Sequence, residues 1–162
     1  MIIKLENLEL LTFDKNNKKH LIFLKKLIND QAVKDRLHGL GGNILHNRNN
    51  LVLGNSFFVQ KDNELIGYIN IGEFNDNEKA IYLKAAITFE YRGKGYGKLM
   101  LHEVSDYIFK NYLEVENIIV KIANDNKASI QTANSCNFKW LRDDFYIKTN
   151  PYLNKENFDI KK

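Results

Sequence analysis

Three glycines spaced by single residues, Gly93, Gly95 and Gly97, are the part of this chain that most clearly indicates chemistry. Glycine allows successive backbone N–H groups to turn toward one centre, because no Cβ blocks positive φ angles or the approach of a ligand. A helix starting there would add unpaired amides and the positive end of its dipole. Basic side chains surround the glycines, namely those of Arg92, Lys94 and Lys98. The segment therefore predicts a cradle for a diphosphate.

Two familiar phosphate-binding motifs do not fit this segment. A nucleoside-triphosphate loop would have glycine at Arg92 and serine or threonine at Leu99, and a dinucleotide fingerprint would have glycine at Lys98. A second glycine group at positions 39–42 also fails, because Ile44 occupies the place of its third glycine. The cradle must therefore belong to another class of phosphate site.

A strand before the glycines and a helix after them are needed to position the cradle. The apolar run from Ala80 to Phe89 predicts a strand that leads directly into Arg92, and Tyr96, Met100 and Val104 recur at helical spacing. The other strands are predicted at 8–13, 57–59, 65–71, 118–122, 138–141 and 145–148. The other helices are predicted after a cap at Asp14, over 30–37 and over 127–135, with an irregular loop at 38–50.

These elements predict an α/β (α+β mixed) fold. Hairpins flank one strand–helix–strand unit, which indicates a central, mostly antiparallel, twisted mixed sheet of about six to seven strands flanked by about four helices. The length of 162 residues and the 44% hydrophobic content suit one domain over residues 1–162.

Composition limits the environment and the partners of the chain. No apolar run approaches the roughly 20 residues of a membrane span, so we expect a soluble cytoplasmic protein with no membrane contact. Cys136 is the single cysteine and cannot form an internal disulfide. The four histidines lack metal-ligand spacing, so no metal site is predicted. The net charge of +4 suits anionic ligands in general.

The order Arg92-x-x-Gly95-x-Gly97 between a strand and a helix resembles motif A of the GNAT superfamily of N-acetyltransferases. A second match is the segment Asn126–Ile130 with Asn137-Phe138 downstream, which is similar to the last helix of that superfamily and the Gly-Phe after it. The resemblance covers residues 55–149. The branch that the chain resembles most is the bacterial one that acetylates protein N-termini, ribosomal proteins among them, and small amines.

The resemblance implies a GNAT-like sheet and a binding site for acetyl-CoA as co-substrate. It places the pantetheine arm along the backbone of Ala85, Ala86 and Ile87. It places the pyrophosphate at Arg92, Gly93, Lys94, Gly95, Tyr96, Gly97 and Lys98. Asn126 and Ser129 correspond to positions near the cofactor arm, although helix capping explains either residue equally well.

The same resemblance implies direct attack of a neutral amine on the thioester within a ternary complex. It makes the Ile87 amide the oxyanion donor, because the family strand bulges there. Glu73 at the end of a predicted strand is the first candidate for the base, with Glu90 behind it, and a solvated turn residue is the other interpretation of Glu73. Ala133 stands where many members carry the tyrosine that protonates the thiolate, so water or another tyrosine must supply that proton.

Three functions follow from these observations. The first is an N-acetyltransferase that acts on a primary amine, at a protein N-terminus or on a small molecule, as a monomer or homodimer. The second is a noncatalytic acetyl-CoA sensor of the same fold, which Ala133 keeps open. The third is a basic module that binds nucleic acid through residues 92–98; the spread of lysines along the chain argues against it.

Overall fold

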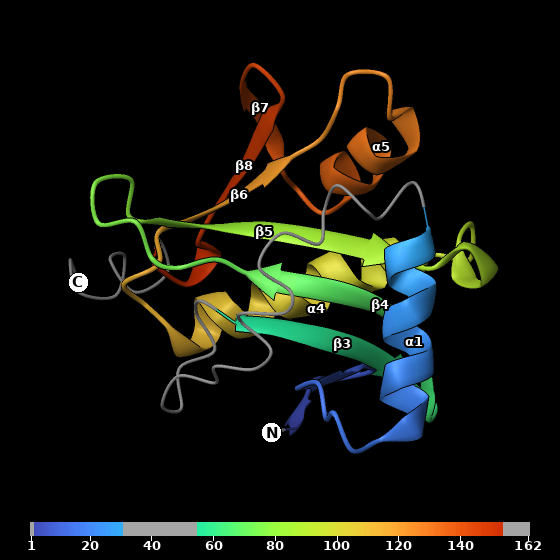
Figure 1. The fold of residues 1–162 in the computed structure, drawn as a ribbon. Coiled ribbons are helices and arrows are strands. Elements are labelled where there is room, and N and C mark those ends of the chain that lie inside the picture. Colours follow the sequence, from blue (N-terminus) through green and yellow to red (C-terminus); the bar gives the residue numbers. More distant parts are fainter. Residues whose placement is uncertain (1, 31–54, 154–162) are drawn as a thin grey trace.

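Residues 2–30 and 55–153 are described by the computed structural model, and in them one eight-stranded sheet carries helices on both faces (Figure 1). The strands are β1 (Ile2–Lys4), β2 (Glu9–Leu11), β3 (Asn55–Lys61), β4 (Glu64–Ile71), β5 (Ala80–Ile87), β6 (Asn117–Lys121), β7 (Lys139–Arg142) and β8 (Phe145–Thr149). The helices are α1 (Lys18–Asn29), α4 (Tyr96–Asn111), α5 (Lys127–Ser135) and the 3-10 helix η1 (Phe89–Tyr91).

The strands lie in the order β1-β2-β3-β4-β5-β6-β8-β7, and every neighbouring pair is antiparallel except β5 with β6. Helix α4 supplies the crossover that a parallel pair requires. The predicted mixed sheet is confirmed. It has one strand more than expected, because β1 is only three residues long and shows too little alternation to be recognised in the sequence.

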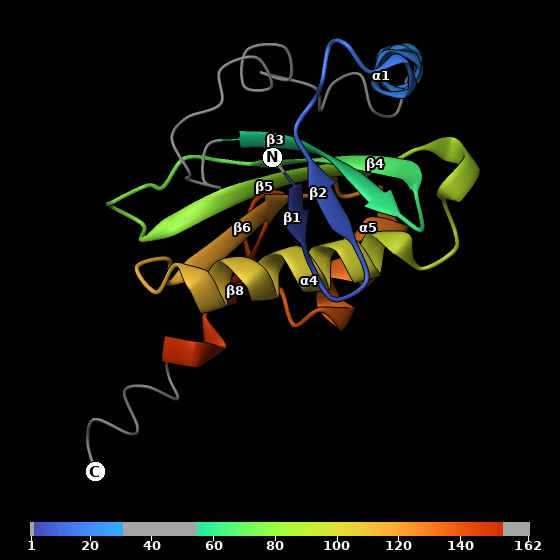
Figure 2. The same ribbon diagram turned by 90° about the horizontal axis from the view of Figure 1, so that it is seen from below.

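The two faces of the sheet bury different side chains, as the alternation of strand residues requires. Helix α4 packs Val104 and Ile108 into the larger core, which also takes in Ile81 of β5. Helix α1 covers the opposite face, where Phe23 lies 5.1 Å from Phe58 of β3 between ring centroids. Figure 2 shows the sheet between these two helices. In the described stretches no helix is long and apolar enough to cross a membrane.

Most strand boundaries differ by one or two residues from the sequence expectation, and two differences bear on the packing and the site. The cap of α1 is Asn17, whose side chain accepts from the amides of Lys19 and His20. The predicted cap Asp14 lies three residues before Asn17, and its side chain accepts from the Asn16 amide instead. Strand β5 ends at Ile87 and does not run into Arg92, because the chain first makes the turn of η1. The predicted helix over 30–37 and the loop over 38–50 lie outside the described residues, apart from Asp30.

Glu103 fastens the amino-terminal strands to α4 from inside the molecule. Its side chain is 5% exposed, and its Oε1 atom accepts from the amides of Asn7 at 2.8 Å and Leu8 at 3.2 Å. Its Oε2 atom accepts from the side-chain amide of Asn7 at 2.9 Å. One carboxylate therefore satisfies three donors of the turn between β1 and β2.

His20 makes the stability of the α1 face depend on pH. It is buried against Phe13 and Phe58, and its Nδ1 atom accepts from the Asp14 amide at 2.9 Å. Burial lowers the pKa of His20, and the nearby Asp14 carboxylate only partly opposes this. The unfolded chain therefore takes up the proton first as the pH falls, and stability is lost below about pH 6.5. His20→Asn keeps a side-chain acceptor and removes the titration, so the fall in Tm from about pH 7.5 to about pH 5.5 should be smaller than in the wild type.

Candidate functional site

The glycine turn has the backbone that its sequence predicts. Gly93 has φ +75° and Gly95 has φ +83°, values that residues other than glycine rarely adopt. Gly95 is the N-cap of α4 and forms no side-chain cap bond. The first intrahelical bond here runs from the Leu99 amide to the Gly95 carbonyl, at 3.1 Å. The amides of the first helical turn therefore point out of the helix end without helical partners.

Space and charge at this turn suit an anion. A Cβ atom added to Gly93, Gly95 or Gly97 would meet no atom within 4 Å. The first turn of α4 carries no acidic residue, and the side chains of Lys94 and Lys98 are exposed beside it. The Lys94 ammonium lies 5.6 Å from the centre of the Tyr91 ring. The turn therefore combines amide donors, a helix dipole and two cations, and it fits a diphosphate group.

Strand β5 leaves its parallel partner before it ends. The last pair with β6 is Leu83 with Val120, and β5 continues to Ile87. The Gly72 amide donates to the Tyr82 carbonyl, and the Thr88 amide donates to the Ile66 carbonyl. These two hydrogen bonds show which residues of β5 turn their main-chain groups toward β4. Ile87 lies opposite Gly67 between such positions, so its N–H and C=O groups point away from β4, toward the side where pairing with β6 has ended.

No bulge is present at Ile87. The register between β4 and β5 is regular from Leu83 to Ile87, and the irregularities of the sheet fall at Val59/Gln60 and Trp140/Arg142. The family-based expectation of a bulge in this strand is therefore wrong for the described structure. The direction of the Ile87 amide follows instead from ordinary antiparallel alternation and from the early end of the β5–β6 pairing.

The segment between β5 and the glycine turn is held by contacts to the hairpin of β3 and β4. The Thr88 amide donates to the Ile66 carbonyl at 3.0 Å, and the Tyr91 hydroxyl donates to Glu64. That hydrogen bond raises the pKa of Tyr91 to about 12. These contacts fix the direction in which the chain enters the glycine turn.

The guanidinium of Arg92 does not point freely into the turn. Its Nε atom donates to the Ile87 carbonyl at 2.9 Å, and its Nη2 atom donates to Asp30 Oδ2 at 2.8 Å. Asp30 is the C-cap of α1, and its side chain is only 17% exposed. Nothing in the sequence marks Asp30 as the partner of Arg92, because the two residues lie 62 positions apart.

Helix α5 starts as predicted, at Lys127. The Asn126 side chain caps it by accepting from the Ser129 amide at 3.2 Å. The capping interpretation of Asn126 is therefore confirmed, and its contact with a cofactor stays a prediction. Ala133 is completely buried in the larger core. That position presents only a methyl group and no hydroxyl.

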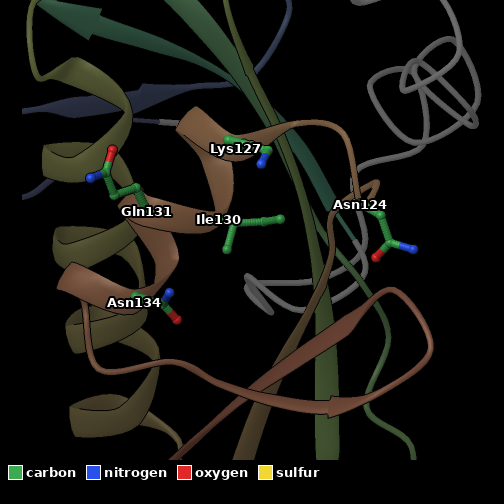
Figure 3. A pocket seen from close by; sticks show the side chains of 5 residues that line it. All are labelled: Asn124, Lys127, Ile130, Gln131 and Asn134. Atoms are coloured by element: carbon green, nitrogen blue, oxygen red, sulfur yellow. The ribbon is translucent and has the colours of Figure 1, made fainter.

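Two hollows lie near these elements without including the predicted site residues. One of about 320 Å³ runs along α5, and Figure 3 shows four of its side chains on that helix and Asn124 on the loop before it. The other, of about 680 Å³, lies between α1 and the β3–β4 hairpin. The hollow on α5 is lined by Asn124, Lys127, Ile130, Gln131 and Asn134. Neither hollow reaches the glycine turn.

Glu73 and Ile87 are not brought together. Glu73 is exposed and lies between the Gly72–Tyr82 bond and the Asn75–Ala80 bridge, level with Ile81. Ile81 and Ile87 are six residues apart on β5, which corresponds to roughly 20 Å in an extended strand. If the reacting carbonyl lies at Ile87, a base at Glu73 would therefore have to take the proton of the attacking amine through a chain of water molecules. Glu90, the other predicted base, is paired with Lys26 at 2.9 Å.

Buried polar side chains on the α1 face form a chain that the sequence does not reveal. The Asn70 amide donates to Ser56 Oγ at 2.8 Å, and the Tyr68 hydroxyl lies 3.4 Å from the same oxygen. Tyr68 is opposite Ala86 in the β4–β5 register. Burial raises the pKa of Tyr68, so this hydroxyl stays neutral.

Cys136 has a structural role. It is buried at the end of α5, its thiol donates to the Lys98 carbonyl at 3.6 Å, and burial raises its pKa. Such a thiol is a poor nucleophile. Among the described residues, no three His, Cys, Asp or Glu side chains are grouped as metal ligands.

Comparison with known proteins supports the interpretation of the turn. The sequence profile of a family described as an acetyltransferase (GNAT) domain matches residues 7–139. No curated protein matches the chain in sequence. Among solved structures, the ribosomal α-N-protein acetyltransferase RimL in complex with coenzyme A is similar at a TM-score of 0.69, with 19% identity over 92% of this chain and 98% of that chain.

Two further solved structures show the same fold. An acetyltransferase from Salmonella typhimurium that modifies the N-terminal serine of a 50S ribosomal subunit protein has a TM-score of 0.68 and 20% identity, over 92% of this chain and 99% of that chain. Spermidine N-acetyltransferase from Vibrio cholerae, in complex with CoA and spermine, has a TM-score of 0.67 and 18% identity, over 89% and 96%. At such identities the likeness concerns the fold.

Proposed function

Since the chain belongs to the GNAT family of acetyl-CoA-dependent N-acetyltransferases, we propose that it moves the acetyl group of acetyl-CoA to a primary amine, at a protein N-terminus or on a small molecule. The observation that carries the proposal is the amino-terminal end of α4, where two glycines with positive φ precede unpartnered amides. Proteins of similar fold include one that modifies a protein N-terminus and one that acetylates spermidine. The family match argues against the nucleic-acid module, whereas the noncatalytic sensor has the same fold and is distinguished by thiol release.

The proposed donor site uses main-chain atoms in two places. The amides of residues 93–98 hold the pyrophosphate, with Lys94 and Lys98 balancing its charge. The backbone of Ala85, Ala86 and Ile87 lies along the pantetheine arm, and Asn126 and Ser129 flank it from α5. Acetyl-CoA supplies the activated acyl group, and the Ile87 amide donates to the carbonyl oxygen of its thioester as negative charge develops there.

Proton transfer in this proposal uses Glu73 and water. The Glu73 carboxylate accepts the acceptor's proton through a chain of several water molecules, because the register places it roughly 20 Å from Ile87 along β5. Water also protonates the leaving thiolate, since Ala133 provides no acid. Glu73→Gln should lower kcat about tenfold and leave the KM for acetyl-CoA unchanged. Glu78→Gln, a change in the same loop, is the control in a steady-state thiol-release assay.

A two-stage experiment tests the function as a whole. Acetyl-CoA at about 100 times its Kd should raise the Tm by roughly 5–10 °C. Thiol release should then be followed with spermidine and with a peptide that starts with serine. Binding without thiol release from any amine would favour the sensor. A Tm that ignores acetyl-CoA, together with salt-dependent binding of nucleic acid, would favour the third hypothesis.

A further inference from the structure

Arg92 joins the end of the cofactor strand to the end of the first helix. Its guanidinium bridges the Ile87 carbonyl, 2.9 Å from Nε, and the Asp30 carboxylate, 2.8 Å from Nη2. Asp30 is the C-cap of α1, so the bridge connects an element on one face of the sheet to the last residue of β5. The planar guanidinium makes both bonds at once, because Nε and Nη2 hold their donors at fixed angles in one rigid group.

The charge of this arginine is already balanced. The Asp30 side chain is mostly buried and lies in contact with the guanidinium, so the pair carries no net charge toward a ligand. A carboxylate at that place would repel a diphosphate if the guanidinium turned away from it. The exposed ammonium groups of Lys94 and Lys98 remain beside the amides of the turn. The charge that a diphosphate needs is therefore supplied without Arg92.

The hydrogen bond from Arg92 to the Ile87 carbonyl lies on the side of β5 where pairing with β6 has ended. Pairing with β6 ends at Leu83, and the N–H and C=O groups of Ile87 both point away from β4. A fixed carbonyl restricts the backbone angles of Ile87, and through them the direction of its N–H group. The contact of Arg92 therefore sets the geometry of a main-chain donor in the proposed site.

We propose that Arg92 is a positioning residue, which with Asp30 aims the Ile87 amide at the thioester and does not bind the pyrophosphate. This inference rests on the proposed function, because it assumes that the Ile87 amide faces the acyl group. It extends to Asp30, the C-cap residue of α1, which the glycine motif does not contain. A motif arginine that stands next to a phosphate site thus serves the reacting end of the donor.

The test compares two acetyl donors, acetyl-CoA and S-acetylpantetheine, which lacks the pyrophosphate. Arg92→Lys and Asp30→Ala should each lower kcat/KM about tenfold with both donors, mainly through kcat. The double variant should be no worse than either single one, because one bridge is broken in all three. Lys98→Ala provides the contrast, since it should weaken acetyl-CoA and leave S-acetylpantetheine unaffected.

A matched control separates the bridge from general loosening of α1. Lys26→Met removes the exposed ion pair between α1 and Glu90, at 2.9 Å, and should leave kcat/KM with both donors unchanged. Far-ultraviolet circular dichroism and Tm check the folding of each variant. The inference is overturned if Arg92→Lys impairs acetyl-CoA alone, or if Asp30→Ala has no effect, while the proposed function stands. A wild-type protein that consumes neither donor would end both.

Discussion

Replacing Gly95 by aspartate is expected to abolish the rise in Tm that acetyl-CoA produces in the wild-type protein. Gly95 is the N-cap of α4, and an added side chain enters open space beside the unpartnered amides. A carboxylate there would occupy those amides and repel the pyrophosphate, and a repulsion of several kcal/mol weakens binding more than about 100-fold. Titration calorimetry and the thermal shift measure the loss.

Gly95→Asn is the matched control for the effect of charge. Asparagine and aspartate tolerate the left-handed conformation to a similar degree, so both variants carry the strain of φ +83°. Only aspartate adds a negative charge. Asparagine should therefore leave a measurable thermal shift, and both proteins should stay folded in the absence of ligand. Equal shifts for the wild type and Gly95→Asp would contradict the location of the phosphate site.

Glu103→Ala is expected to destabilise the protein strongly, although it truncates a charged side chain. The carboxylate is 5% exposed and accepts from Asn7 and Leu8. Its removal leaves the buried Leu8 amide without an acceptor, at a cost of about 3 kcal/mol for the three lost bonds together. For a domain of this size that corresponds to a fall in Tm of roughly 6–12 °C.

Two further variants show whether the hydrogen bonds cause this loss. Glu103→Gln keeps one acceptor oxygen and should lose less than half as much stability. Glu114→Ala changes an exposed carboxylate just beyond the same helix and should be nearly neutral. The acid-sensitive group His20 lies on the other face of the sheet and should titrate in all of these proteins. A Tm within about 2 °C of the wild type for Glu103→Ala would show that water replaces the carboxylate.

The sequence was informative where a local pattern determines local structure. Single-residue spacing of glycines predicted the turn and the start of α4 at Tyr96, because only glycine takes these φ angles cheaply. Asn126 likewise predicted the start of α5, since a side-chain acceptor at that position caps the helix. The hairpin turn at Asp62 and Asn63 also has a local cause, because Asp and Asn tolerate the positive φ that both residues adopt there.

Prediction failed where the partner lies far away in the chain. Arg92 fits a phosphate motif, and only folding brings Asp30 to it across 62 positions. Glu103 has the sequence context of a solvated helix residue, yet its partners lie 95 and 96 positions away. Asp14 and Asn17 are equally suitable caps by residue type, and the packing of His20 against Phe58 decides between them. Such choices depend on tertiary contacts that no local pattern contains.

The order of the strands also bears on how the protein behaves in concentrated solution. The two outermost strands are β1, with three residues, and β7, with four, and the long strands β3 to β5 lie inside the sheet. Short edge strands offer few main-chain hydrogen-bonding groups to a strand of another molecule. Trp140 on β7 is 64% exposed, yet Lys139 and Arg142 flank it and the register shifts between Trp140 and Arg142. The two edge strands of the sheet therefore resist aggregation by strand addition.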